Sequence, residues 1–404
     1  MKLKIFICLL VVSHFNVTAQ IDSTLLKQTK SANDSLALNM DAVYNRPFMK
    51  GGNSTAVGGY LEANWQHLGT DGVTEGHQFQ VRRMTLFVAS AISSRVSFMS
   101  EIEFEEGGKQ IAIEFAAVDI EFNPLLNLRS GIVMNPIGSF NQNHDGPKWE
   151  FTDRPFSATQ LLPATWSNAG FGLFGQYYKD GWKLGYEVYA TGGFDASIVE
   201  NDMNRTFLPA SKANGERFEE GNVLFTGKVA ARHKQIGELG LSYMAGQYNV
   251  DEKDGLVLDE ARCVRAAAID FGTTIPRLKT KVTGEVTKIW IDVPSTYSQQ
   301  LGNEQIGGFV DLVQPLINRP FLNYANAMVS LAVRVEYVDW NIGTFDQTGG
   351  DIGDELWSVM PGLSFRPTQE TVLRLNYQYM SEVDLLGNPP AKTAGFSFGV
   401  SSYF

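Results

Sequence analysis

From about residue 57 to its end, the chain repeats one pattern: apolar and polar side chains alternate over stretches of about ten residues. In residues 182–191, for example, Leu184 and Val188 share one parity, whereas Lys183 and Glu187 share the other. A period of two places successive side chains on opposite faces of a β-strand. Charged side chains can face inward in strand after strand only where the enclosed space holds water, which excludes a small soluble core. The pattern therefore predicts a water-filled β-barrel.

The spacing of these stretches predicts an all-β fold, namely a transmembrane antiparallel β-barrel of the outer-membrane porin type with about 16 strands. Short turns alternate with longer connections, as in outer-membrane barrels, and the longer ones include 135–168 and 193–222. Strands 79–90 and 111–122 lose phase midway, which predicts a β-bulge in each. The predicted strands are 57–66, 77–90, 94–105, 111–122, 128–134, 169–178, 182–192, 223–232, 238–249, 260–271, 278–291, 305–316, 325–338, 354–366, 370–382 and 394–404.

The last twelve residues, 393–404, form a strand with one aromatic and aliphatic face and one small, polar face. An unpaired edge strand at the end of a soluble protein invites aggregation, whereas in a closed barrel the last strand pairs with the first. A terminal Phe404 preceded by alternating apolar residues resembles the C-terminal signature of bacterial outer-membrane proteins. We therefore expect Phe404 to act as an assembly signal read by the barrel assembly machinery.

The first residues predict export. A short basic segment with Lys2 and Lys4 precedes an apolar run and a cleavage point after Ala19, so residues 1–19 read as a signal peptide. Residues 20–55 are polar and are predicted to be a partly disordered periplasmic lead-in, and residues 56–404 to be the barrel. Cys263 is then the only cysteine left, so an internal disulfide is not expected. Together these features predict a protein of the Gram-negative outer membrane.

Charge and motifs narrow the function further. The formal charge of −11 becomes −13 once the two lysines of the leader are removed, and this argues against nucleic acid as a partner. No zinc-binding His pair, nucleophile elbow or Gly-rich phosphate loop is present, so we expect no metal, no cofactor and no catalytic residues. Acidic connections such as 251–260 are interpreted as solvated surface, bridged through cations to lipopolysaccharide.

Three stretches, in order and spacing, resemble the phosphate-selective porin O and P family in a version like that of Bacteroidetes. The resemblance covers roughly 77–180 and implies a homotrimer of sixteen-stranded barrels in which loop 135–168 folds inward to narrow the pore. It also implies a ladder of basic residues along the channel and anions such as phosphate as solutes. The stretches are Phe79-Gln80-Val81-Arg82-Arg83-Met84-Thr85-Leu86, Phe122-Asn123-Pro124-Leu125-Leu126-Asn127-Leu128-Arg129-Ser130-Gly131 with Met134-Asn135-Pro136-Ile137-Gly138, and Asn168-Ala169-Gly170-Phe171-Gly172-Leu173.

Basic residues on polar faces or on the inward loop are the candidates for lining the pore and attracting anions, because the charge around a constriction selects ions. Each has an alternative role. Arg82 and Arg129 could pair with Asp119, Glu121 or Glu103 on neighbouring strands, and Lys148 and Arg154 with Glu150 or Asp153. Acids on the same faces depart from a purely basic ladder. The candidates are Arg82, Arg95, Arg129, Lys148, Arg154, Lys183, Arg334 and Arg374.

The predicted function is passive diffusion of small solutes, anions such as phosphate among them, through an outer-membrane porin. Two alternatives remain open at this point. One is a general porin without anion preference, and the other is a barrel enzyme of the lipase or protease type, whose Ser–His pair spacing alone would not reveal.

Overall fold

The computed structural model describes residues 37–44, 46–47, 55–203, 205–212, 222–294, 301–345 and 348–404. The predicted signal peptide, and all of the predicted lead-in except 37–44, 46–47 and 55, lie outside these described residues. Among the residues described, no helix has the length and apolar character needed to span a membrane.

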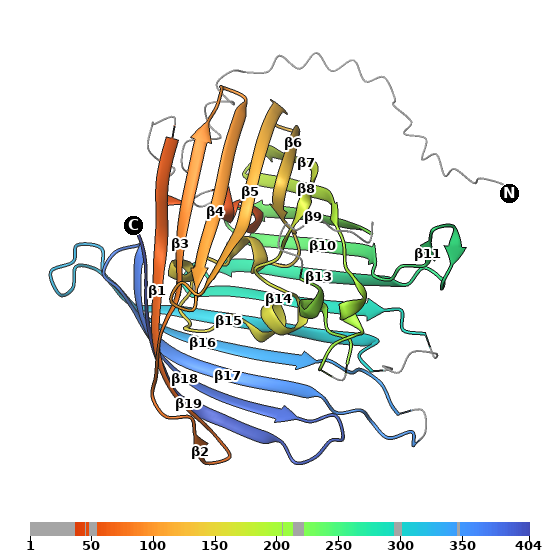
Figure 1. The fold of residues 1–404 in the computed structure, drawn as a ribbon. Helices are drawn as coiled ribbons and strands as arrows, with labels where there is room; N and C mark the ends of the chain where they lie inside the picture. Colours follow the sequence, from red (N-terminus) through yellow and green to blue (C-terminus); the bar gives the residue numbers. More distant parts are fainter. Residues whose placement is uncertain are drawn as a thin grey trace. The chain divides into compact units, whose positions relative to one another are not determined.

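Sixteen long strands form one antiparallel ring in which each strand pairs with its neighbours in the chain (Figure 1). This count leaves out β2, a two-residue strand in the connection between β1 and β3 that belongs to the same sheet. Every predicted strand is present, and its ends lie within four residues of the prediction. The strands are β1 (Thr55–Thr70), β3 (Gln78–Ala91), β4 (Val96–Glu105), β5 (Gln110–Asn123), β6 (Leu126–Met134), β7 (Ser167–Lys179), β8 (Trp182–Gly192), β9 (Val223–His233), β10 (Gly237–Gln247), β13 (Cys263–Thr274), β14 (Lys281–Ile291), β15 (Glu304–Asn318), β16 (Met328–Asp339), β17 (Glu355–Arg366), β18 (Thr371–Val383) and β19 (Ala391–Tyr403).

The remaining elements are short and lie ahead of β1 or in the connections between strands. They are β2 (Val73–Thr74), the hairpin of β11 (Glu252–Lys253) and β12 (Leu256–Val257), and the helical segments η2 (Asn39–Tyr44), η4 (Asn141–Asn143), η5 (Gly146–Lys148), η6 (Ser157–Leu161), η7 (Ala196–Ile198) and η8 (Leu208–Ser211).

The ring closes between the last strand and the first, as predicted. The pairing of β19 with β1 runs from Tyr60 opposite Tyr403 to Thr70 opposite Thr393. It continues past the strand end, because the Phe404 amide donates to the Gly59 carbonyl at 3.0 Å. The described part of the barrel therefore leaves no unpaired edge between its termini.

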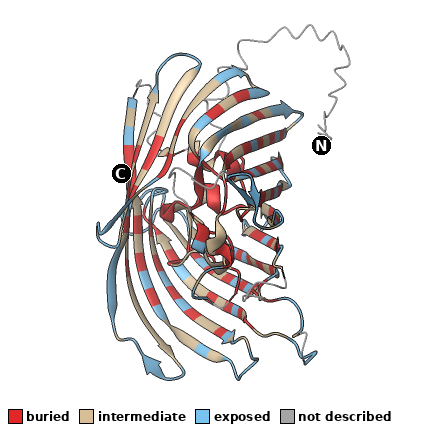
Figure 2. Ribbon diagram, turned by 45° about the vertical axis from the view of Figure 1, so that its right-hand side comes forward, coloured by how far each residue is buried: buried red, intermediate tan, exposed pale blue. Residues whose placement is uncertain are grey.

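The alternation predicted for the strands sets the two faces of the barrel (Figure 2). In β8, Lys183 and Glu187 are buried, whereas Leu184 and Val188 on the opposite face are 45% exposed. A continuous outward belt of exposed apolar side chains is unfavourable in water and suits hydrocarbon. The inward face holds the charges.

Both predicted bulges are present. Glu62 lies opposite Arg83 and Ala63 opposite Val81, so Arg82 is the extra residue of β3. In the same way, Glu114 is the extra residue of β5. A bulge lets two successive residues turn to one face, and both arginines of the Arg82-Arg83 pair contact groups inside the barrel.

The connection between β6 and β7, residues 135–166, lies within the barrel, and its coils cross the interior in Figure 1. We call it the inward loop. Three of its aromatic side chains are almost fully buried, with Phe140 2%, Phe151 1% and Trp166 1% exposed. That the loop 135–168 narrows a pore, as the resemblance implies, stays a prediction.

Replacing Phe404 by Ser should lower the amount of assembled protein in the outer membrane several-fold. The Phe404 ring is 61% exposed and its backbone bonds to Gly59 do not need the side chain, so the fold itself should tolerate the change. The measurement is the heat-modifiable band in outer-membrane fractions. Phe396→Ser is the control, because Phe396 is also an exposed phenylalanine of the last strand. An equal loss in both variants would contradict an assembly role for Phe404.

Candidate functional site in the barrel lumen

The inward loop is bonded to the strands on the far side of the barrel. The Thr152 amide donates to the Asn376 side chain of β18 at 2.9 Å, and the Thr152 hydroxyl lies 2.6 Å from that of Ser397 in β19. The Phe156 amide donates to the Glu336 carboxylate of β16 at 2.8 Å. Buried backbone groups need such partners, so the inward polar side chains hold the loop across the lumen.

Two predicted candidates, Arg374 and Arg334, anchor the inward loop. Arg374 donates to the Phe151 carbonyl at 2.6 Å and to the Glu62 carboxylate at 2.9 Å. Arg334 makes two 2.7 Å bonds to the Asp311 carboxylate and a third to the Asp153 carbonyl. Each guanidinium is 1% exposed, because it is enclosed between the wall and the loop. Neither side chain faces an open passage.

Arg82 and Arg154 also meet the inward loop. Arg82 donates to the Asp153 carboxylate at 2.5 Å, and this ion pair holds the pKa of Asp153 below its usual range against the effect of burial. Arg154 lies on the loop itself, donates to the Thr165 hydroxyl at 3.0 Å and is 3.8 Å from Glu103. The pairing of Arg154 with Glu150 or Asp153 that the sequence left open is not found; Thr165 and Glu103 are its partners.

Arg129 pairs across neighbouring strands, which was one of its two predicted roles. It donates to both oxygens of Asp119, at 2.7 and 2.8 Å, and to the Tyr189 hydroxyl at 2.8 Å. Its guanidinium also lies over the rings of Tyr44 and Phe174, at 3.9 and 4.3 Å from their centres. These contacts fully enclose the charge.

The described part of the N-terminal region contacts inward-facing residues of the barrel, and the assignment of residues 20–55 as a periplasmic lead-in stays a prediction. Asp41 pairs with Lys183 of β8, and the Asn39 amide donates to the Glu238 carboxylate of β10 at 2.9 Å. Lys148 donates to the Ala42 carbonyl at 3.0 Å and lies 3.3 Å from Asp145, not beside Glu150 or Asp153. These contacts require tertiary proximity that a polar, weakly patterned stretch does not disclose.

Arg95 was predicted on a polar strand face, and this prediction is wrong. The amides of Ile92 and Ser93 both donate to the Val96 carbonyl, at 2.9 and 3.0 Å, and these bonds close a turn ahead of β4. Arg95 is therefore an exposed turn residue. The other seven candidates contact groups inside the barrel, and each has at least one hydrogen-bonding or ionic partner there.

Interior cations that were not among the predicted candidates include Lys228, which lies 2.7 Å from Asp270, and the three that follow. Arg83 lies 3.4 Å from both Glu62 and Glu103. Arg366 donates to Glu150 at 2.8 Å, and Arg46 binds two carboxylates. The loss of phase in β3 could have indicated Arg83, because a bulge turns adjacent residues to one side. No sequence signal marks Arg46.

The inward face is not polar throughout. Toward the ends of the strands that carry the longer connections, an apolar cluster joins the inward loop to the connection between β8 and β9. Its members include Leu161 and Trp166 from the inward loop and Phe194, Ile198 and Leu208 from that connection. They pack on inward-facing residues of the wall such as Met244, Val264, Ala266 and Ile289. The alternation of apolar and polar residues does not predict this cluster. Its inward-facing apolar residues are favourable only because the two connections cover them, and alternation does not show where those connections lie.

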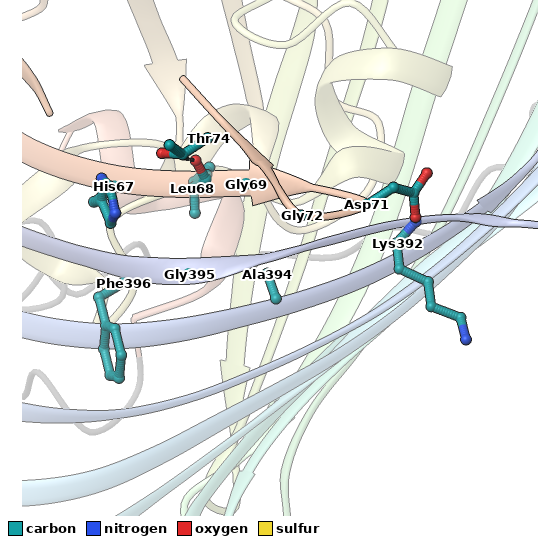
Figure 3. A pocket seen from close by; sticks show the side chains of 10 residues that line it. All are labelled: His67, Leu68, Gly69, Asp71, Gly72, Thr74, Lys392, Ala394, Gly395 and Phe396. Atoms are coloured by element: carbon teal, nitrogen blue, oxygen red, sulfur yellow. Dashed lines mark hydrogen bonds between the residues drawn. The ribbon is translucent and has the colours of Figure 1, made fainter. Parts of the chain in front are cut away.

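A hollow of about 460 Å³ lies away from these candidates, beside the turn between β1 and β2 (Figure 3). His67 of β1 and Phe396 of β19 line one side, and Asp71 and Lys392 lie near the turn. The Lys392 amide donates to the Asp71 carboxylate at 3.0 Å. The hollow contains none of the predicted pore-lining residues, so it is not part of the candidate site.

Removing the charge of His144 should weaken the pH dependence of stability. Burial acts to lower the pKa of His144, but the Glu101 carboxylate, 3.1 Å from Nε2, outweighs it and the pKa is raised. A raised pKa stabilises the fold fully below the unfolded value of about 6.5, and this contribution is lost as pH rises through the folded value. Wild-type melting temperature should therefore fall as pH rises from about 6.5, and that of His144→Gln should fall less.

Asp145 does not contribute to this slope. Although burial acts to raise the pKa of Asp145, the Arg46 guanidinium lowers it well below its usual range. Its stabilising contribution is present above its unfolded pKa and is lost only as pH falls through the lower folded value. Equal pH slopes in wild type and His144→Gln would contradict the assignment to His144.

Several solved structures of outer-membrane proteins have a fold similar to that of this chain. Pseudomonas putida OprB aligns with a TM-score of 0.55 at 10% identity, over 87% of this chain and 94% of that one. The outer-membrane channel DcaP of Acinetobacter baumannii aligns with 0.53 at 12% identity, over 88% and 99%. The chain has the fold of an outer-membrane porin. The anion-selective porin of Comamonas acidovorans aligns with 0.51 at 12% identity, over 87% and 99%.

Comparison by sequence gives less information about the family than comparison by structure gives about the fold. No protein-family model matches the chain. An uncharacterized protein of Aquifex aeolicus (strain VF5) is 28% identical over 207 residues, 49% of this chain and 46% of that protein. The chain thus spans less than half the length of this curated relative. Membership in the phosphate-selective porin O and P family stays a prediction from its motifs, and the porin fold is what these likenesses establish.

Proposed function

We propose that the protein is an outer-membrane channel through which small polar solutes diffuse passively, without covalent chemistry. One observation carries the proposal: a closed ring of sixteen strands turns charged side chains inward and apolar side chains outward. An apolar exterior suits lipid and a charged interior suits water, which is the division found in porins.

We further propose that the channel has no anion preference, which is the alternative that the sequence left open. The family resemblance implies a ladder of basic residues, but such residues attract anions only if their charge is uncompensated. Here Arg129 faces Asp119, Arg334 faces Asp311 and Lys183 faces Asp41. Arg82 likewise faces Asp153, and Arg374 faces Glu62. Phosphate selectivity is therefore the less favoured form of the proposal.

The same proposal places the protein in the Gram-negative outer membrane, in contact with lipid and lipopolysaccharide and inserted by the barrel assembly machinery. A homotrimer is part of it, supported by the similar fold of Vibrio cholerae OmpT, one structure of which is described as its trimer form and aligns with a TM-score of 0.52 at 9% identity. Crosslinking in native outer-membrane vesicles tests this assembly, and a band at the mass of one chain alone would contradict it.

The experiment that tests the function is the reversal potential of the refolded protein in a planar bilayer under a KCl gradient, repeated with added phosphate. We expect steady conductance, a reversal potential at zero or on the cation-selective side, and no block by phosphate. Anion preference with phosphate block would overturn the proposed selectivity and support that of the resembled family. A folded barrel without conductance would overturn the channel itself.

A further inference from the structure

The Arg46 side chain is enclosed inside the barrel by two carboxylates and an aromatic ring. Its Nη2 lies 2.6 Å from a Glu101 oxygen, and its Nε and Nη2 donate to the two oxygens of Asp145 at 3.0 and 2.8 Å. The guanidinium carbon lies 3.5 Å from the centre of the Phe87 ring. Arg46, Glu101 and Phe87 are all 0% exposed.

The walls of this pocket are held by contacts that do not involve Arg46. The Tyr403 hydroxyl of β19 donates to Asp145 at 2.7 Å, and Lys148 lies 3.3 Å from the same carboxylate. His144 bridges the other side, with Nε2 3.1 Å from Glu101 and Nδ1 2.7 Å from the Asn141 carbonyl. Strands and inward loop thus build the pocket, and a different part of the chain fills it.

The geometry of the pocket matches a guanidinium group. Two parallel N–H bonds to one carboxylate use the planar fork of a guanidinium, which an ammonium group lacks. An aromatic face beneath the plane adds a cation–π contact. The Glu101, His144 and Asp145 ligand atoms also lie within 4.8 Å of one another, a spacing that could hold a metal ion. The Phe87 face and the two-bond contact favour a guanidinium instead.

The charge of the pocket requires a cation. With Arg46 in place, Glu101 and Asp145 are balanced by Arg46 and Lys148, with His144 between them. Without Arg46, the two buried carboxylates would face only Lys148 and His144, and whenever His144 is neutral one buried negative charge would lack a partner, which is unfavourable. Binding of a free cation of the right shape in the place of Arg46 would therefore be favourable.

We propose that Phe87, Glu101, His144 and Asp145 form a guanidinium-binding site in the lumen, which Arg46 occupies within its own chain and which solutes carrying a guanidinium group occupy when Arg46 is absent. The solute class rests on the proposed channel function, whereas the binding site does not. Arginine and short arginine-containing peptides are the ligands of this class.

Calorimetric titration of the folded barrel in detergent with L-arginine tests the site. The Arg46→Ala variant should bind at least tenfold more tightly than wild type, in which Arg46 competes. Citrulline, which has the same shape without the charge, should not bind. The double variant with Arg46→Ala and Glu101→Gln should lose the binding. Equal affinity for arginine and citrulline, or binding of Zn²⁺ but not of arginine, would overturn the proposal.

A refolding assay keeps the proposal testable if Arg46→Ala does not fold alone. Adding arginine, but not citrulline, should raise the refolding yield of Arg46→Ala. The control is Arg95→Ala, which lacks an arginine from an exposed turn and whose refolding yield should rise less. An equal effect on both variants would overturn the site. Detergent binding does not depend on conduction, so a conducting Arg46→Ala barrel without arginine binding refutes the site alone. A non-conducting barrel that binds arginine refutes the channel alone.

Discussion

Shortening the inward loop by replacing residues 139–163 with a short Gly-Ser connection should raise the single-channel conductance several-fold. The loop crosses the lumen between β6 and the strands opposite, and its Phe140 and Phe151 side chains are almost fully buried. The conductance of a water-filled barrel depends on its free cross-section, which this loop reduces. The strand ladders do not involve the loop, so the barrel should still close.

Removing the β11–β12 hairpin, residues 251–258, is the matched control for this deletion. The hairpin carries exposed apolar residues such as Leu256 and Val257, and it pairs only with itself among the described strands. Its loss should leave conductance unchanged. Planar-bilayer recordings of the two variants make the comparison. Equal conductance in wild type and in the variant with the shortened inward loop would show that the loop does not narrow the passage.

Replacing Arg374 by Met should destabilise the barrel by about 3–5 kcal/mol, the typical cost of leaving a buried charge without its partner. Arg374 is 1% exposed and bonds to Glu62, which is itself 4% exposed, and to the Phe151 carbonyl. Because Arg83 also lies 3.4 Å from Glu62, we expect the lower end of this range. Denaturant unfolding in detergent measures the change, together with faster proteolysis of the inward loop.

Arg95→Met is the control for this substitution, because Arg95 is exposed and its replacement should change stability by no more than about 0.5 kcal/mol. The double variant with Arg374→Met and Glu62→Gln should recover part of the loss, since the buried carboxylate is then neutral. Similar unfolding midpoints for the Arg374 and Arg95 variants would refute the anchoring role of Arg374.

Strand number, closure and bulges could be predicted from the sequence because they depend on local properties. A period of two is visible within a single strand, and a loss of phase marks the extra residue of a bulge, as at Arg82 and Glu114. Strand ends were less precise. Arg95 was misplaced by one residue, because the bonds of Ile92 and Ser93 to Val96, not hydrophobicity, decide where β4 begins.

The ionic partners of inward-facing charged residues could be predicted from the sequence only where both residues lie on neighbouring strands. Arg129 and Asp119 lie directly opposite each other on β6 and β5, so their pairing follows from register. Lys183 meets Asp41, and Arg374 meets the inward loop, across more than a hundred residues of chain. Such contacts depend on where a connecting segment runs inside the barrel, and many weak interactions together determine that position.

The sequence by itself therefore determined the barrel and the face on which each strand carries its charges, because alternation with a period of two acts residue by residue. Only the tertiary structure decided what those charges do. It placed the inward loop and the Arg46 side chain among them, and it brought carboxylates beside Arg46, Arg129, Arg334 and Arg374. The reason is physical: a buried charge requires a partner, and the fold determines which partner is within reach.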